Sequence, residues 1–171
     1  MYRIITALSS LARTGWMLRG VPSTLAETVA EHLFASAVIA LEAGYRLKDE
    51  GVEVDPHKAA AIALAHDMGE ALIGDIAKVS GIDKTRVEEE AVARISGWVE
   101  QLYKEFEHGS SIEARIARAS ELAATILRAR RYMTEGFKDV KEIEESSIKA
   151  LDKVTAGDEK LRKIMMDLLE A

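Results

Sequence analysis

Cysteine is absent from this chain of 171 residues. Its absence excludes disulfide bonds, thiolate zinc sites and a cysteine nucleophile. A protein-bound metal ion would therefore be held by histidine, aspartate and glutamate side chains. The chain contains only four histidines, so few positions can contribute an imidazole ligand.

Long apolar runs and blocks of basic residues are also lacking. No stretch of 18 apolar residues occurs, and the longest apolar run, 59–65, suits a buried helix, so we expect no membrane span and a cytoplasmic protein. Acidic residues exceed basic ones, 23 − 29 = −6, and no cluster of lysine and arginine stands out. This charge distribution argues against a sequence-independent grip on duplex nucleic acid.

Side-chain amides are nearly missing, since the chain has no asparagine and Gln101 as its one glutamine, while charged residues reach 30%. That bias is typical of a protein from a thermophile. The first 26 residues carry three arginines and no acidic residue. This pattern superficially resembles an organellar transit peptide, but the favoured interpretation is an amphipathic first helix of the domain.

Proline is scarce, with two residues, and helix-forming residues dominate, so the sequence predicts an all-α fold without strands. The length and the 48% hydrophobic content suit one domain over residues 1–171. We expect a bundle of about six to seven helices. Their approximate ranges are 2–13, 24–48, 56–65, 84–106, 110–133, 141–154 and 158–169.

Three helix starts carry a capping signal. They are Thr24 with Glu27, Asp55 with Pro56, and Ser110 with Glu113. The charged turn at 86–90 is interpreted as a solvated helix face without chemistry.

The histidines are not equivalent. His57 and His108 lie in polar surroundings and are expected to face solvent, whereas His32 and His66 have apolar neighbours. A buried neutral imidazole needs a hydrogen bond or a metal ion, and a lone one is more often a core residue than a ligand. His66, however, is followed by Asp67 and, one helical turn later, by Glu70. One imidazole and two carboxylates at one helix end suit a divalent cation and proton transfer.

The order of His32, the pair His66 and Asp67, Glu70 and Asp75 resembles the HD-domain phosphohydrolases. Within them the chain is most similar to the 5′-deoxynucleotidase branch, through the segments RTGW (13–16), ETVAEH (27–32) and SSIEARIARASELAATIL (110–127). The resemblance covers about residues 4–135 and implies a single HD-domain helical bundle, in which the helices over 141–170 are peripheral.

The resemblance implies that a divalent metal ion (Co, Mn, Mg, Zn or Ni) is bound by His32, His66, Asp67 and an aspartate on a later helix. Ser120 stands at that fourth position. A hydroxyl is a weak, neutral ligand, so the metal site is either weakened or completed by another group. Water held by Ser120 is one candidate. Glu121 is another, although one step along a helix rotates a side chain by about 100°, which predicts a local distortion.

By the same resemblance, Glu70 and Asp75 serve the proton transfers, Arg13 binds the phosphate, and Trp16 stacks on base or sugar. Trp16 taken alone is equally well an apolar plug between helices. The expected function is hydrolysis of the 5′-phosphate of (deoxy)nucleoside monophosphates by a phosphoric monoester hydrolase. The alternatives are a nucleotide-binding HD protein whose catalysis is weakened or lost through Ser120, and a helical dimerisation protein. Related enzymes are commonly dimers, so we expect a homodimer or higher homo-oligomer.

Overall fold

The computed structural model describes residues 1–76, 81 and 84–170, and these residues form an all-α structure, as predicted. The structure has more elements than the sequence predicts. The single turns α2 and α5 are additional, and the predicted helix 84–106 is divided into α6 and α7. The elements are α1 (Tyr2–Ser10), α2 (Thr14–Met17), α3 (Val29–Asp49), α4 (Pro56–Ala65), α5 (Glu70–Ile73), α6 (Lys84–Ala93), α7 (Gly97–His108), α8 (Ile112–Thr134), the 3-10 helix η2 (Lys138–Val140), α9 (Lys141–Val154) and α10 (Glu159–Glu170).

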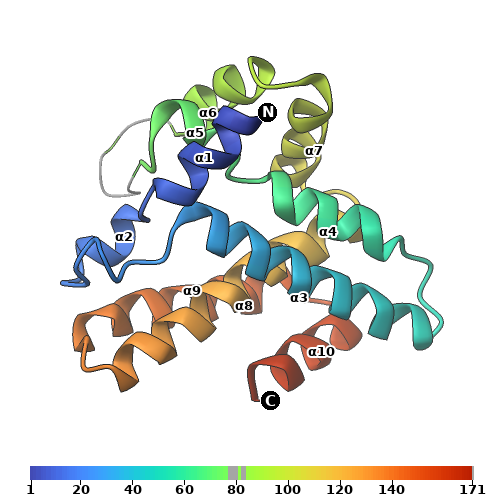
Figure 1. Cartoon of the computed structure of the whole chain (residues 1–171). Coiled ribbons are helices and arrows are strands. Elements are labelled where there is room, and N and C mark those ends of the chain that lie inside the picture. Colours follow the sequence, from blue (N-terminus) through green and yellow to red (C-terminus); the bar gives the residue numbers. More distant parts are fainter. Residues whose placement is uncertain (77–80, 82–83, 171) are drawn as a thin grey trace.

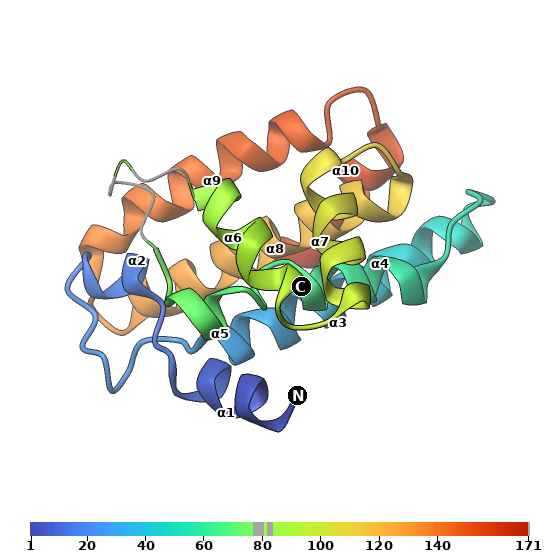
Figure 2. The same cartoon turned by 90° about the horizontal axis from the view of Figure 1, so that it is seen from above.

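Helices α3, α4 and α8 pack against one another and form the centre of the bundle. In Figure 1, α1, α5, α6 and α7 lie on one side of this centre, and α9 runs alongside α8. Seen from above, α1 and α9 lie on opposite sides of the bundle (Figure 2). Within the described residues, no helix combines the length and apolarity that crossing a membrane requires.

Small residues allow the central helices to approach closely. Ala43, Ala59 and Ala63 are fully buried where α3 meets α4. A Cβ atom on Gly44 would lie 2.8 Å from the Cα of Pro56, closer than two carbons can pack. Glycine is therefore required where α3 crosses the start of α4.

The start of α3 differs from the prediction. Its capping box consists of Thr28 and Glu31, which exchange side-chain and backbone hydrogen bonds, and not of Thr24 and Glu27. Both pairs have the spacing of a capping box, so the pattern alone could not separate them. Glu27 is 2% exposed, and its carboxylate contacts Trp16 and Arg128 instead of capping a helix.

The other two helix starts are close to their predicted positions. Asp55 caps α4 through the backbone N–H groups of His57 and Lys58, and Pro56 is the first helical residue. The cap of α8 is Ser111, one residue after the predicted Ser110. Glu113 makes no capping box there, because the third residue after Ser111 is Ala114. The carboxylate of Glu113 instead accepts the backbone N–H of Asp55 and so connects α8 to α4.

Candidate active site

Two buried histidines face each other at the centre of the bundle. His32 belongs to the first turns of α3 and His66 follows the last residue of α4, and their ring centroids are 5.2 Å apart. His32 is 0% exposed, and neither of its ring nitrogens has a hydrogen-bond partner among the described residues. Leaving a buried polar group unpaired costs about 1–3 kcal/mol, so such a ring indicates a missing ligand.

The ring of His66 is oriented by its own helix. Its Nδ1 lies 2.7 Å from the carbonyl oxygen of Ala63, which can only accept, so Nδ1 carries the proton and donates. Nε2 then points toward Oδ2 of Asp67 at 3.1 Å, without hydrogen-bond geometry. A lone pair and a carboxylate at this distance require a proton or a cation between them.

The pKa shifts of His32, His66 and Asp67 fit a cation site. Burial, followed by the charges of Arg13 and His66, holds the pKa of His32 well below its ordinary value, so this ring is neutral and can act as a ligand. Burial opposes charge on His66, but Asp67 raises the pKa of that ring. Despite its burial, Asp67 has a pKa held well below its usual range, chiefly by His66.

The fourth ligand position is occupied differently from the family pattern. Ser120 is fully buried and its hydroxyl donates to the carbonyl oxygen of Ile116 at 2.8 Å. Glu121 is half-buried, and its carboxylate lies in one group with the ring nitrogens of His32 and His66, with all three ligand atoms within 4.8 Å of one another. Helix α8 continues unbroken through this point, so the expected helix distortion is absent.

A second acidic cluster lies beside this group. Asp67, Glu70 and Glu88 place carboxylate oxygens within 4.8 Å of one another. The Nζ atom of Lys84 is 2.9 Å from Glu70 and 3.0 Å from Glu88, so the chain supplies its own cation here. The prediction that the charged turn at 86–90 is purely solvated is therefore wrong for Glu88, which is 7% exposed and accepts a hydrogen bond from Tyr103.

Glu70 is set apart by its protonation. Burial and the negative charge of Asp67 raise its pKa to about 9, although Lys84 partly opposes this. At neutral pH the metal-free protein therefore holds Glu70 as a neutral acid. Its Oε2 atom is buried and has no hydrogen-bond partner among the described residues. A carboxylic acid of this kind can donate a proton.

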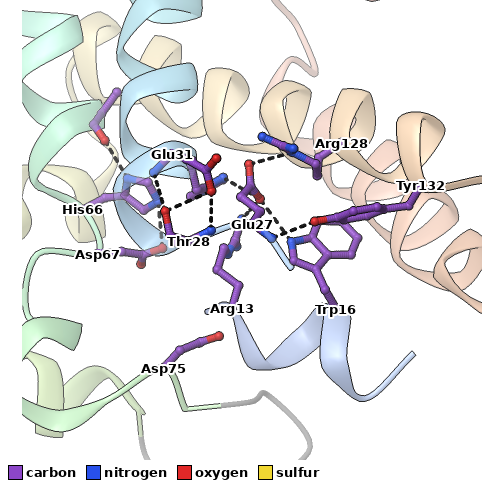
Figure 3. A network of polar contacts seen from close by, with 12 residues as sticks. Arg13, Trp16, Glu27, Thr28, Glu31, His66, Asp67, Asp75, Arg128 and Tyr132 are labelled. Carbon is purple, nitrogen blue, oxygen red and sulfur yellow. Dashed lines mark hydrogen bonds and ion pairs between the residues drawn. The ribbon is translucent and has the colours of Figure 1, made fainter. Parts of the chain in front are cut away.

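The RTGW segment lies against the start of α3. The chain leaves helix after Ser10, earlier than the predicted Arg13, and Ala12 pairs with Thr28 in an isolated antiparallel bridge. Arg13 and the indole of Trp16 consequently point toward Glu27 (Figure 3).

Glu27 holds three donors at once. Its carboxylate lies 3.4 Å from Arg13, 3.1 Å from Nε1 of Trp16 and 3.2 Å from Arg128. Trp16 is 2% exposed and its ring packs edge-on to Tyr132 at 5.2 Å, as an apolar plug would. Glu27 thus orients the side chain that is expected to bind phosphate.

Asp75 connects the segment after α5 to α2. Its carboxylate accepts the backbone N–H of Thr14, and its own carbonyl oxygen accepts the hydroxyl of the same residue. Figure 3 shows the Asp75 side chain directed toward Arg13. Burial lowers the pKa of Arg13, but Glu27, Asp67, Glu121 and Glu70 together raise it, so the guanidinium remains charged.

A cavity of about 280 Å³ opens next to these groups. Arg13, Asp75, Lys84 and Glu121 line it, together with Trp16. Uncharged residues also line it, from α8 and from α9, which lies outside the core of the resemblance: Leu122, Thr125, Ile143, Ser146 and Ser147.

Sequence reasoning missed several of these residues. The capping pattern does not reveal the contacts of Glu27, and no role for Lys84 or Thr125 is predicted from the sequence. Only Lys84 left a clear signal, since it precedes Glu88 by four residues on one helix face. The two histidines expected to face solvent do so: the His57 side chain is 76% exposed, and His108 is exposed.

Known proteins are similar to most of this chain. The sequence model of the HD domain family matches residues 5–164. The human protein 5′-deoxynucleotidase HDDC2 is 33% identical over 141 residues, which are 76% of this chain and 65% of the human protein. The match thus spans slightly less than two thirds of that relative.

Two solved structures from Pyrococcus cover 98% of this chain. A conserved hypothetical protein of Pyrococcus furiosus is 28% identical, with a TM-score of 0.89 and 96% of its own chain covered. The PH0347 protein of Pyrococcus horikoshii is 30% identical, with a TM-score of 0.85 and 93% covered. The chain belongs to the HD-domain family.

Proposed function

We propose that this protein is a metal-dependent phosphoric monoester hydrolase that removes the 5′-phosphate of deoxynucleoside monophosphates. The observation that carries the proposal is the pair of buried rings, His32 and His66, whose unpartnered nitrogens lie next to carboxylates and beside a cavity lined by Arg13. The name of the human relative supplies the substrate class.

His32, His66 and Asp67 would hold the metal ion. The unpartnered ring nitrogens and the low pKa of the Asp67 carboxyl give a donor set of two imidazoles and a carboxylate, in which a bound ion would replace the proton that Asp67 favours on His66. Among the expected divalent cations, Co, Mn, Zn and Ni accept such a mixed set of nitrogen and oxygen ligands, whereas Mg prefers oxygen ligands. When bound, the ion polarises the phosphoryl group and lowers the pKa of a water molecule.

The remaining residues bind the phosphate and move the proton. Arg13 offers a planar pair of donors for phosphate oxygens, and Glu27 keeps that guanidinium in place. Water attacks phosphorus, the bond to the 5′-oxygen breaks, and Glu70 supplies the proton that the leaving oxygen needs and regains one from the attacking water. Asp75 holds the N-terminus of α2 so that Arg13 and Trp16 stay at the cavity.

The rest of the cavity suits a nucleoside. Leu122 and Ile143 provide apolar surface, while the buried hydroxyl of Thr125 lacks a hydrogen-bond partner among the described residues. Ligand sites combine a mostly apolar lining with a few polar groups in this way. We further retain a cytoplasmic location, a homo-oligomer and a thermophilic source as predictions from the sequence.

The alternative, a nucleotide-binding protein with weakened or lost catalysis through Ser120, has no support from the relatives, because the human relative is itself named a 5′-deoxynucleotidase. The carboxylate of Glu121 near both histidines also weakens the premise of a missing ligand.

Phosphate release tests the proposal. Purified protein supplied with Mn²⁺ or Co²⁺ is expected to release phosphate from deoxynucleoside monophosphates, and His66→Ala is expected to abolish release. His57→Ala is the matched control and should keep wild-type activity, because that ring is exposed. Release that survives His66→Ala would refute the site.

A further inference from the structure

We infer that Glu121, and not Ser120, completes the metal centre of this chain, so that the fourth ligand has moved by one residue along α8. The inference concerns the metal site of the proposed function and names a carboxylate that the family pattern does not contain.

The positions of the two side chains favour Glu121 over Ser120 as the fourth ligand. The carboxylate of Glu121 has a ligand atom within 4.8 Å of the donor nitrogens of both His32 and His66. Glu121 also lines the cavity beside Arg13, so a cation bound by it lies where a phosphate can reach. Ser120 is absent from the lining residues of that cavity.

Ser120 is already engaged. Its hydroxyl donates to the carbonyl of Ile116 one turn earlier, and the residue is 0% exposed. A hydroxyl used in this way satisfies its own proton inside the helix. Neither the position nor the chemistry of this hydroxyl offers the negative charge that a divalent cation prefers.

The histidines supply the independent sign of a ligand. Both ring nitrogens of His32 and Nε2 of His66 are buried and unpartnered among the described residues. A cation held by one ring nitrogen of His32, Nε2 of His66, Asp67 and Glu121 would give both rings a partner and offset the negative charge of the carboxylates. The side chain of glutamate is one methylene longer than that of aspartate, which lets it reach the site from an unbroken helix.

Mn²⁺ titration by calorimetry, without nucleotide, tests this assignment. Glu121→Gln and Glu121→Ala are expected to weaken Mn²⁺ binding at least roughly tenfold, because even outer partners of a metal contribute about 10–100-fold in affinity. Ser120→Ala should stay within about twofold of wild type, and Glu113→Gln, on the same helix, is the control for loss of a carboxylate. Melting curves in chelator establish that each variant folds.

The outcomes separate this inference from the phosphatase proposal. Wild-type Mn²⁺ affinity in both Glu121 variants would overturn it, and so would a tenfold loss in Ser120→Ala. A tenfold gain in Ser120→Asp would also overturn it, since it would mean that the native site lacks a ligand. If Mn²⁺ binding depends on Glu121 but no nucleotide is hydrolysed, the metal assignment stands and the proposed activity fails.

Discussion

Replacing Glu27 by glutamine is expected to destabilise the protein far more than the same change at Glu31. Both glutamates follow a threonine by three residues, and sequence alone assigns either to a capping box. In the structure, Glu27 is 2% exposed and accepts from Arg13, Trp16 and Arg128, whereas Glu31 is exposed and closes the capping box.

The magnitude follows from the three donors. A hydrogen bond to a charged group contributes about 1.5–3 kcal/mol, and the amide keeps one oxygen acceptor but loses the charge. The guanidiniums can partly turn to water, because the Arg13 and Arg128 side chains are 19% and 32% exposed. We therefore expect Glu27→Gln to lower the free energy of unfolding by about 2–4 kcal/mol, which corresponds to a fall in Tm of roughly 5–15 °C.

The control change, Glu31→Gln, should cost less than about 0.5 kcal/mol, because glutamine also closes a capping box. Urea unfolding of metal-free protein, followed by circular dichroism, measures both variants. Equal and small losses for the two would refute the description of Glu27 as the buried centre of this network.

Three further changes test other parts of the structure. Gly44→Ala should destabilise the protein by about 1–3 kcal/mol in urea unfolding, because the added carbon meets the start of α4, whereas Gly97→Ala, with open space around it, should not. Thr28→Ala should lower the free energy of unfolding by about 1 kcal/mol and Thr24→Ala should leave it nearly unchanged. The reverse order would show that Thr28 is not the cap of α3. In chelator, stability should fall as pH rises between the ordinary carboxyl pKa of 4.5 and the raised pKa of Glu70, about 9, because only the folded state keeps that proton. Glu70→Gln should flatten this fall, and an unchanged pH profile would show that Glu70 is not protonated.

The helices were predictable because their signals are local. Apolar periodicity and the scarcity of proline predict an all-α chain, and Asp55 before Pro56 marks the start of α4 correctly. The prediction of a helix start was wrong where two candidate capping residues stand close together in the sequence. Thr24 and Thr28 each precede a glutamate by three residues, and only the contacts of the buried Glu27 carboxylate with donors from other segments decide between them.

The sequence singled out His32 and His66, but it could not predict how the side chains around them connect. Their apolar neighbours indicated that both histidines are buried, and the structure places the two ring centroids 5.2 Å apart. A run of three glutamates cannot reveal that Glu88 alone turns inward to Lys84 and Tyr103. The reach of Glu121 depends on side-chain length across a helix crossing, which the rotation per residue does not describe.

The central claim is that His32 and His66 bind one divalent cation together, and histidine ring nitrogens report this most directly. With four histidines in the chain, nitrogen-15 spectra of labelled protein can be followed while Zn²⁺ is added. We predict that the ring signals of His32 and His66 shift together and saturate at one ion per chain, while those of His57 and His108 stay unchanged. Shifts confined to the exposed pair, or buried rings that ignore the ion, would contradict the account.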